Sequence, residues 1–150
     1  MNRPGKRNLR PIGLGKQSRH KKALFLPMGR GEADGLVLPV RIALERIRQG
    51  KPDRDAAVCM AEIVLLTGFL TEGGFGRLDT PFLEDVERRL LTELDQGGAG
   101  SGWIFAPELV DGLVVVVNEY DRLIRETRLQ AIVEANDCFT RLNRATVVSS

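Results

Sequence analysis

The 38 residues after Gly112 contain neither glycine nor proline, so nothing in the local sequence stops a helix there. Apolar residues recur in this part of the chain every three or four positions, as they do along one buried helix face. The first run is Leu109, Leu113, Val116, Tyr120 and Leu123, and the second is Ile132, Ala135, Phe139 and Leu142. The pattern predicts a helix of about 35–40 residues that begins at Pro107 and is roughly 55 Å long.

A helix of this length exceeds what a small bundle needs, so we expect it either to break or to protrude. Apolar turns that protrude commonly pack against another chain, which favours a homodimer. The run VVVV at 114–117 leaves a second question open, because β-branched residues have low helix propensity and also suit a short buried strand. A helix is the preferred interpretation, since no partner strand is visible elsewhere in the sequence.

Two shorter helices are predicted upstream. The first runs from Pro39 to Gln49, with proline in its first turn and Gly50 as its stop. The second begins after Asp53, a good N-cap residue, and reaches about Glu72. It is apolar on nearly all sides, which is typical of a helix in the middle of a bundle.

A further helix is predicted from Thr80 and Pro81 to about Gln96, before the flexible connection GGAGSG. Together these segments predict an all-α fold, a bundle of about four helices with a long C-terminal helix. We expect a basic, Pro/Gly-rich, irregular tail over residues 1–35 and one helical domain over residues 36–150. With 43% hydrophobic and 28% charged residues, the chain is able to bury a core.

The first 22 residues carry eight cations and no carboxylate. These cations are Arg3, Lys6, Arg7, Arg10, Lys16, Arg19, Lys21 and Lys22. The net charge is therefore +8 for residues 1–22 and −6 for residues 23–150, where 14 cations meet 20 carboxylates. High charge, interleaved glycine and proline and few apolar residues predict that this tail is disordered when free.

A flexible polycation of this kind binds phosphate backbones by releasing condensed counterions. We therefore assign the eight cations as candidate nucleic-acid-binding residues. The tail lacks aromatic side chains that could stack on bases, so the contact is expected to be non-specific. A solubilising tail, or one that pairs with its own acidic body, is the alternative interpretation.

Residues for enzyme chemistry do not occur in suitable combinations. The only histidine, His20, lies among the tail cations, which favour its neutral form. GGAGSG lacks the Gly-Lys-Ser/Thr ending of a phosphate-binding loop, and a predicted helix precedes it. Cys59 and Cys138 lie far apart in helix-like sequence, so we expect two small buried side chains rather than a disulfide or zinc site. We expect no enzyme activity, no cofactor and no metal site.

The stretch 53–78 has the outline of a helix-turn-helix, with a helix, a glycine-containing break and a hydrophobic continuation. A recognition helix needs exposed Arg, Lys, Asn or Gln side chains to read base edges. The candidate positions here hold Thr67, Thr71, Glu72 and Arg77, and a carboxylate would repel phosphates. A helix-turn-helix is therefore not expected.

Trp103 and Tyr120 are the candidate partner-binding residues of the body. Trp103 is the only tryptophan and follows the flexible connection. It would either anchor that connection to the core or act as a hot spot for a partner, a role in which tryptophan is enriched.

Most carboxylates of the body are interpreted as solvated. Glu62 interrupts an apolar helix, but it shares one narrow stripe with Asp55 and Cys59 that would be the wet edge of that helix. Other carboxylates lie four residues from an arginine, a spacing worth only tenths of a kcal/mol on a solvated face. The pairs are Asp121 with Arg125, Arg122 with Glu126, and Asp137 with Arg141.

The N-terminus lacks the uninterrupted apolar core of a secretory signal. The longest apolar stretch, residues 56–70, contains Glu62 and is too short to cross a bilayer comfortably. We therefore expect a cytoplasmic protein without membrane contact.

Two stretches, LTGFLTEGGFGRLD at 66–79 and YDRLIRETRL at 120–129, resemble a family of small proteins from β-proteobacterial plasmids and phages. The shared layout, a basic Pro/Gly-rich start followed by an all-helical body, extends over most of the chain. Family members often carry the label of Fis-like transcriptional regulator, which implies a regulatory role for a mobile element. A Fis-type reader has a strongly basic C-terminal helix, whereas the last helix predicted here alternates its charges, so no functional residue is carried over.

These observations favour a non-enzymatic, nucleic-acid-associated accessory or regulatory protein of a mobile element. Its basic tail would contact phosphates, while the acidic body would engage a protein partner or a second copy. The alternative is a protein-interaction module, an adaptor or inhibitor of a host protein that acts through the acidic helical body.

Overall fold

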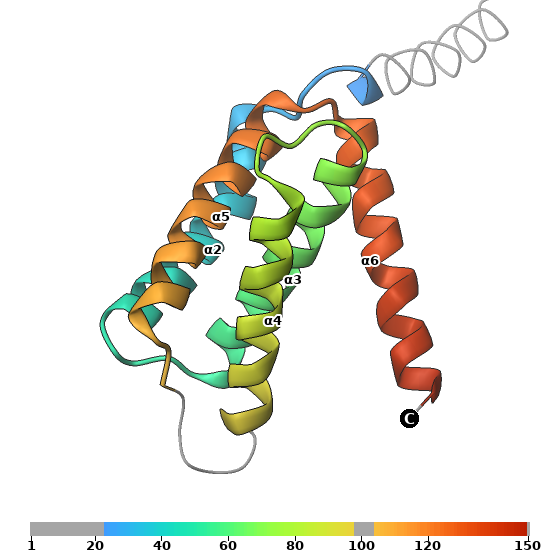
Figure 1. Cartoon of the computed structure of the whole chain (residues 1–150). Helices are drawn as coiled ribbons and strands as arrows, with labels where there is room; N and C mark the ends of the chain where they lie inside the picture. Colours follow the sequence, from blue (N-terminus) through green and yellow to red (C-terminus); the bar gives the residue numbers. More distant parts are fainter. Residues whose placement is uncertain (1–22, 98–103, 150) are drawn as a thin grey trace, which may run out of the picture.

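The structure is a computed structural model that describes residues 23–97 and 104–149, with side-chain environments through residue 144. The helices of this part of the chain are α2 (Arg30–Arg48), α3 (Arg54–Glu72), α4 (Thr80–Gln96), α5 (Pro107–Glu126) and α6 (Leu129–Ser149). Successive helices run in opposite directions; α2 to α5 form a bundle, and α6 packs on α3 (Figure 1). The predicted all-α bundle is confirmed for the described residues.

The core lies between the apolar faces of these helices. The side chains with no exposed surface include Ala57, Met60, Leu113, Val116, Val117 and Leu123. Gly112 lets α4 approach α5 closely, since a Cβ atom there would lie 2.9 Å from Cγ2 of Val86. Residues 114–117 are helical, as preferred from the sequence, because burial of half of the run against the core offsets its low helix propensity.

Helix α2 begins at Arg30, so the prediction that it begins at Pro39 is wrong, and residues 30–35 are helical rather than irregular. Pro39 lies inside the helix on its exposed side. A buried stripe continues across it at helical spacing: Ala33, Val37, Val40, Leu44 and Ile47. Burial of this stripe against α3 and α5 offsets the helical hydrogen bond that an internal proline removes.

Helices α3 and α4 have the predicted bounds. Asp53 caps α3 as expected, because its Oδ1 accepts a hydrogen bond from the Ala56 N–H at 2.7 Å. Helix α4 has Pro81 in its first turn, and its N-cap is Asp79, one residue before the predicted Thr80. Helix α3 contacts α2, α4, α5 and α6, which explains why it is apolar on most sides.

The long helix predicted from Pro107 breaks at Thr127 and Arg128, the first of the two expected outcomes. Thr127 is buried and has an extended backbone, with φ −89° and ψ 140°. Arg128 forms an antiparallel bridge with Pro27, and its guanidinium lies 5.4 Å from the centroid of the Phe75 ring. The chain therefore reverses, and α6 runs back along α3 (Figure 1). Because the long helix is broken, it no longer gives a reason to expect a homodimer. The homodimer stays a prediction.

Residues 23–28 attach the start of the described chain to the bundle. The carbonyl of Leu26 accepts a hydrogen bond from the N–H of Leu129, the first residue of α6, at 2.8 Å. Met28 packs half-buried against the core, whereas Phe25 and Leu26 are 64% and 60% exposed. The backbone and the Met28 side chain therefore attach this segment to the bundle.

Candidate functional site

The eight cations predicted to bind nucleic acid, Arg3 to Lys22, lie outside the residues that the structure describes. The same is true of Trp103 and of most of the GGAGSG connection. These assignments stay predictions.

Tyr120, the other candidate partner-binding residue, is 5% exposed and belongs to the core face of α5. Burial, followed by the charges of the neighbouring Cys59 and Asp121 groups, raises the pKa of the Tyr120 hydroxyl to about 12. A small edge of the residue lines the apolar groove described below. Tyr120 thus supports the core, and a partner would reach it through that groove.

The raised pKa of Tyr120 gives a testable pH dependence. Between pH 10.0 and about 12 the unfolded chain releases the phenol proton while the folded protein retains it, so stability falls as pH rises through this range. Tyr120 is the only tyrosine, so the ultraviolet absorbance of tyrosinate reports this residue alone. We expect a midpoint near 12 in buffer and near 10.0 in denaturant. Coincident midpoints would show that the hydroxyl is not buried.

An apolar groove of about 530 Å³ lies between α2 and α6 and is called the α2–α6 groove below. It is lined by Met28, Glu32, Leu36, Leu66, Tyr120, Ile124, Leu129, Ile132, Val133 and Asn136. Leu36 and Val133 are 45% and 43% exposed. An apolar groove with exposed apolar side chains at its edge is suited to one face of an amphipathic helix.

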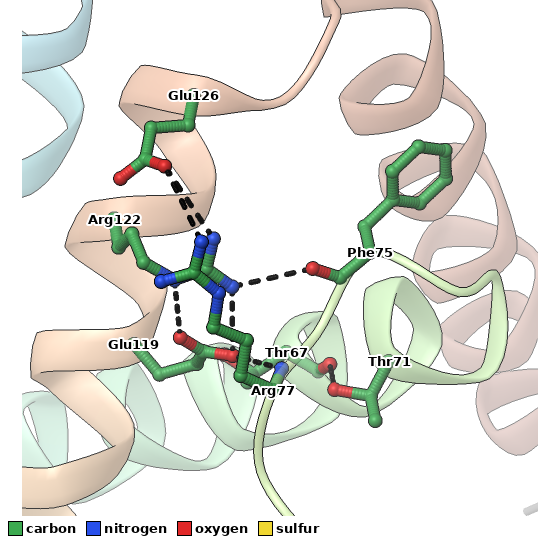
Figure 2. A network of polar contacts seen from close by, with 7 residues as sticks. All are labelled: Thr67, Thr71, Phe75, Arg77, Glu119, Arg122 and Glu126. Carbon is green, nitrogen blue, oxygen red and sulfur yellow. Dashed lines mark hydrogen bonds and ion pairs between the residues drawn. The ribbon is translucent and has the colours of Figure 1, made fainter.

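Figure 2 shows the Glu119 cluster, which consists of Glu119, Arg122, Glu126, Arg77 and the carbonyl of Phe75. Glu119 is 7% exposed and accepts hydrogen bonds from Arg122 Nε at 2.7 Å and Nη2 at 3.0 Å. It also accepts one from the backbone N–H of Arg77 at 2.5 Å. Arg122 Nη2 donates to the Phe75 carbonyl at 3.2 Å. Glu126 is more distant, 3.7 Å from Arg122 and 4.0 Å from Arg77.

The Glu119 cluster holds the loop between α3 and α4 against α5, because Phe75 and Arg77 belong to that loop. Burial acts to raise the pKa of Glu119. The hydrogen bonds from Arg122 and from the Arg77 N–H, together with the charges of both arginines, outweigh burial and hold the pKa below its usual value. Glu119 is therefore ionised at neutral pH and acts as a structural clamp rather than a general acid.

The Asp121 cluster joins α2 to α5. Asp121 pairs with Arg41 at 2.8 Å and with Arg125 at 2.5 Å. Arg41 also donates to Asn118 Oδ1 at 2.8 Å, and Arg125 pairs with Asp34 at 2.7 Å. Burial acts to raise the pKa of Asp121, but the hydrogen bonds and charges of the two arginines outweigh it and lower the pKa. The arginines on this face are therefore already paired with carboxylates.

Both ion pairs predicted on α5 are present, between Asp121 and Arg125 and between Arg122 and Glu126. Each belongs to a cluster that joins separate elements, which the prediction of solvated pairs missed. Glu119 was not among the predicted site residues. The sequence did contain a signal for Glu119, since this carboxylate comes directly before Tyr120 of the apolar stripe and three residues before Arg122.

On α6 an ion pair was predicted between Asp137 and Arg141. The structure instead has a hydrogen bond in which Arg141 Nε donates to the backbone carbonyl of Asp137 at 3.4 Å. Cys138 is exposed, so the prediction that both cysteines are buried is wrong. The reason is that α6 packs on α3 and leaves its other face to solvent.

On α3 the predicted solvated edge is confirmed. Asp55 and Glu62 are exposed, and Cys59 between them is half-buried. Burial, with a smaller effect from the charge of Glu62, raises the pKa of the Cys59 thiol, which makes the thiolate less accessible. Cys59 is accordingly a packing residue in this structure.

The described residues contain no group of three or more His, Cys, Asp or Glu side chains placed to hold a metal ion. Thr67, one position considered for base reading, is fully buried in α3, so it cannot contact DNA bases. Within the same described ranges, no helix has the length and apolar character needed to cross a membrane.

Comparisons of the chain with family models, curated proteins and solved structures find no match. A functional proposal for this protein therefore depends on its own charges, grooves and clusters.

Proposed function

We propose that the protein is a non-enzymatic, nucleic-acid-associated accessory or regulatory protein whose basic N-terminal segment contacts phosphates. The observation that carries the proposal is the separation of charge along the chain, +8 over residues 1–22 and −6 over residues 23–150. Lysine and arginine side chains on one short segment release counterions from a nucleic-acid backbone, whereas an acidic surface repels it.

The ion pairs of the body support this division of roles. At least eight of its arginines pair with carboxylates: Arg41, Arg46, Arg48, Arg77, Arg88, Arg89, Arg122 and Arg125. A cation already paired with a carboxylate has less to gain from a phosphate. Binding to nucleic acid is therefore assigned to the segment, and contact with a protein partner or second copy to the body.

Two full-length variants with equal charge changes test the proposal. One replaces Arg3, Lys6, Arg7, Arg10 and Lys16 by glutamine, and the control replaces Arg30, Lys51, Arg54, Arg141 and Arg144 by glutamine. Fluorescence anisotropy of labelled duplex DNA and single-stranded RNA at low salt gives the affinities. We expect the segment variant to lose at least about a hundredfold in affinity and the control to change by less than about threefold. Equal losses in the two variants would contradict the proposal.

A second candidate, a protein-interaction module, is favoured by the α2–α6 groove. Its proposed occupant is an amphipathic helix, from a host protein or a second copy, whose apolar face would cover Leu36 and Val133. The anisotropy titration separates the two candidates, because a module without a nucleic-acid role leaves the DNA signal unchanged in every variant.

The proposed setting is the cytoplasm, where nucleic acid is accessible and free cysteines stay reduced. A role in a plasmid or phage is part of the proposal and rests on the sequence resemblance alone.

A further inference from the structure

A second groove, of about 290 Å³, lies where α3, α4 and the C-terminal part of α6 meet. Its apolar lining includes Val64, Leu65, Phe69, Leu83 and Leu142. Three carboxylates, Glu72, Glu84 and Glu87, also line it, and among the residues that the structure describes no lysine or arginine does so. This acid-rimmed groove is separate from the α2–α6 groove.

Within the described residues, no ion pair joins Glu72, Glu84 or Glu87 of the acid-rimmed groove to a lysine or arginine. Other carboxylates take part in the ion pairs of the described residues; on α4, for example, Asp85 binds both Arg88 and Arg89. Glu72 and Glu84 are exposed, and Glu87 is half-buried. Three like charges around an apolar floor favour a ligand with cations and a few apolar side chains.

The start of the described chain lies at the same end of the bundle as the loop between α3 and α4 (Figure 1). The carbonyl of Leu26 accepts a hydrogen bond from the N–H of Leu129 at the start of α6. The Arg128 guanidinium lies over the ring of Phe75, which belongs to the α3–α4 loop. Glu72, at the end of α3, is three residues from Phe75. The described chain therefore begins close to the α3–α4 loop, which borders the acid-rimmed groove.

We infer that residues 1–22 of this chain dock on the acid-rimmed groove of the same molecule when no nucleic acid is bound. The segment matches the groove in charge, with eight cations, and contributes the apolar Leu9, Ile12 and Leu14. Twenty-two extended residues span up to about 75 Å, against roughly 28 Å for the length of α3. The covalent tether makes docking intramolecular, at an effective concentration on the order of millimolar.

Docking would place the groove carboxylates where phosphates bind in the proposed function. Each exposed ion pair shifts such an equilibrium by about twofold to fivefold, so the contact is weak enough for a nucleic acid to displace. This consequence rests on the proposed function, whereas docking itself does not.

Carbodiimide cross-linking of the full-length protein tests the docking. The reagent joins a lysine Nζ to a glutamate carboxyl carbon as an amide, and it takes up the water lost and becomes a urea. Four of the five lysines lie in the segment, Lys6, Lys16, Lys21 and Lys22, and the fifth, Lys51, is an internal reference. Mass spectrometry then assigns each cross-link, and mixing isotope-labelled with unlabelled protein separates links within a chain from links between chains.

We expect most segment cross-links to join Glu72, Glu84 or Glu87 of the same chain. The variant Glu72→Gln/Glu84→Gln/Glu87→Gln should reduce the total yield of segment cross-links at least about threefold. The reason is that the ion pairs between these glutamates and the segment cations hold the docked segment in place. The matched control, Glu62→Gln/Glu93→Gln/Asp95→Asn, changes three carboxylates that do not line the groove, one in the middle of α3 and two at the C-terminal end of α4, and should leave the yield unchanged. All six positions are exposed or half-buried, so both variants are expected to fold.

Equal yields in the two variants would overturn the inference, and so would cross-links found only between labelled and unlabelled chains. Added duplex DNA provides a separate arm. Loss of the groove cross-links on addition of DNA supports both docking and the proposed function. Groove cross-links that persist with saturating DNA support docking and count against the proposed function.

Discussion

Replacing Glu119 by alanine lowers the free energy of unfolding by about 2–4 kcal/mol, the largest effect expected from any charged residue of the described body. The substitution leaves the Arg122 guanidinium, whose side chain is 19% exposed, without its main partner. It also removes the acceptor of the Arg77 N–H and frees the loop between α3 and α4. Urea unfolding followed by circular dichroism at neutral pH measures the change.

Glu126→Ala is the matched control, because Glu126 lies on the same helix and faces the same two arginines. Its side chain is 57% exposed and its ion pairs are long, so we expect a change within about 0.5 kcal/mol. Equal destabilisation by the two substitutions would contradict the role of Glu119 as a buried clamp.

The pH dependence of the Glu119 effect has a defined sign. The pKa of Glu119 in the folded protein is below its ordinary value of 4.5, so the stabilisation is complete above about pH 4.5. It is lost as pH falls through the lower, folded-state pKa. The difference in unfolding free energy between the wild type and Glu119→Ala should therefore shrink on acidification.

Helix ends with local signals could be predicted from the sequence. Asp53 caps α3 through a bond to Ala56, three residues away, and Pro81 fits the first turn of α4 wherever the rest of the chain packs. Glu72 and Gln96 end their helices immediately before glycine residues. These signals depend on backbone geometry within a few residues, so they can be read from one segment.

Helix ends set by distant contacts could not be predicted in the same way. Helix α2 continues N-terminally past Pro39 because Val37 and Ala33 reach the core formed by other helices. The break after α5 is accompanied by the bridge between Pro27 and Arg128, about a hundred positions apart in the sequence. In both places tertiary packing outweighs local propensity.

The Glu119 cluster and the acid-rimmed groove could not be predicted from the spacing of residues in the sequence alone. Glu119, Arg122 and Glu126 have the spacing of a solvated helix face, and the sequence does not show that the loop at Phe75 and Arg77 covers them. The acid-rimmed groove likewise brings together α3, α4 and α6, whose residues are up to 78 positions apart. The charge separation, in contrast, is visible in the sequence because it depends only on counts of residues.

The salt dependence of nucleic-acid binding tests the central claim, that the basic segment acts as a phosphate clamp on an acidic body. If most of the eight cations of residues 1–22 contact phosphates, log affinity falls against log salt with a slope of about −5 to −7. Affinity for duplex DNA should then drop by about three or more orders of magnitude between ~50 and ~200 mM salt.

The decisive measurement is this slope for the wild type and for the variant with five segment cations replaced by glutamine. A steep slope in the wild type that becomes shallower by about four in the variant is the predicted result. A slope that is the same in both proteins, or the absence of binding by the wild type at ~50 mM salt, would contradict the account.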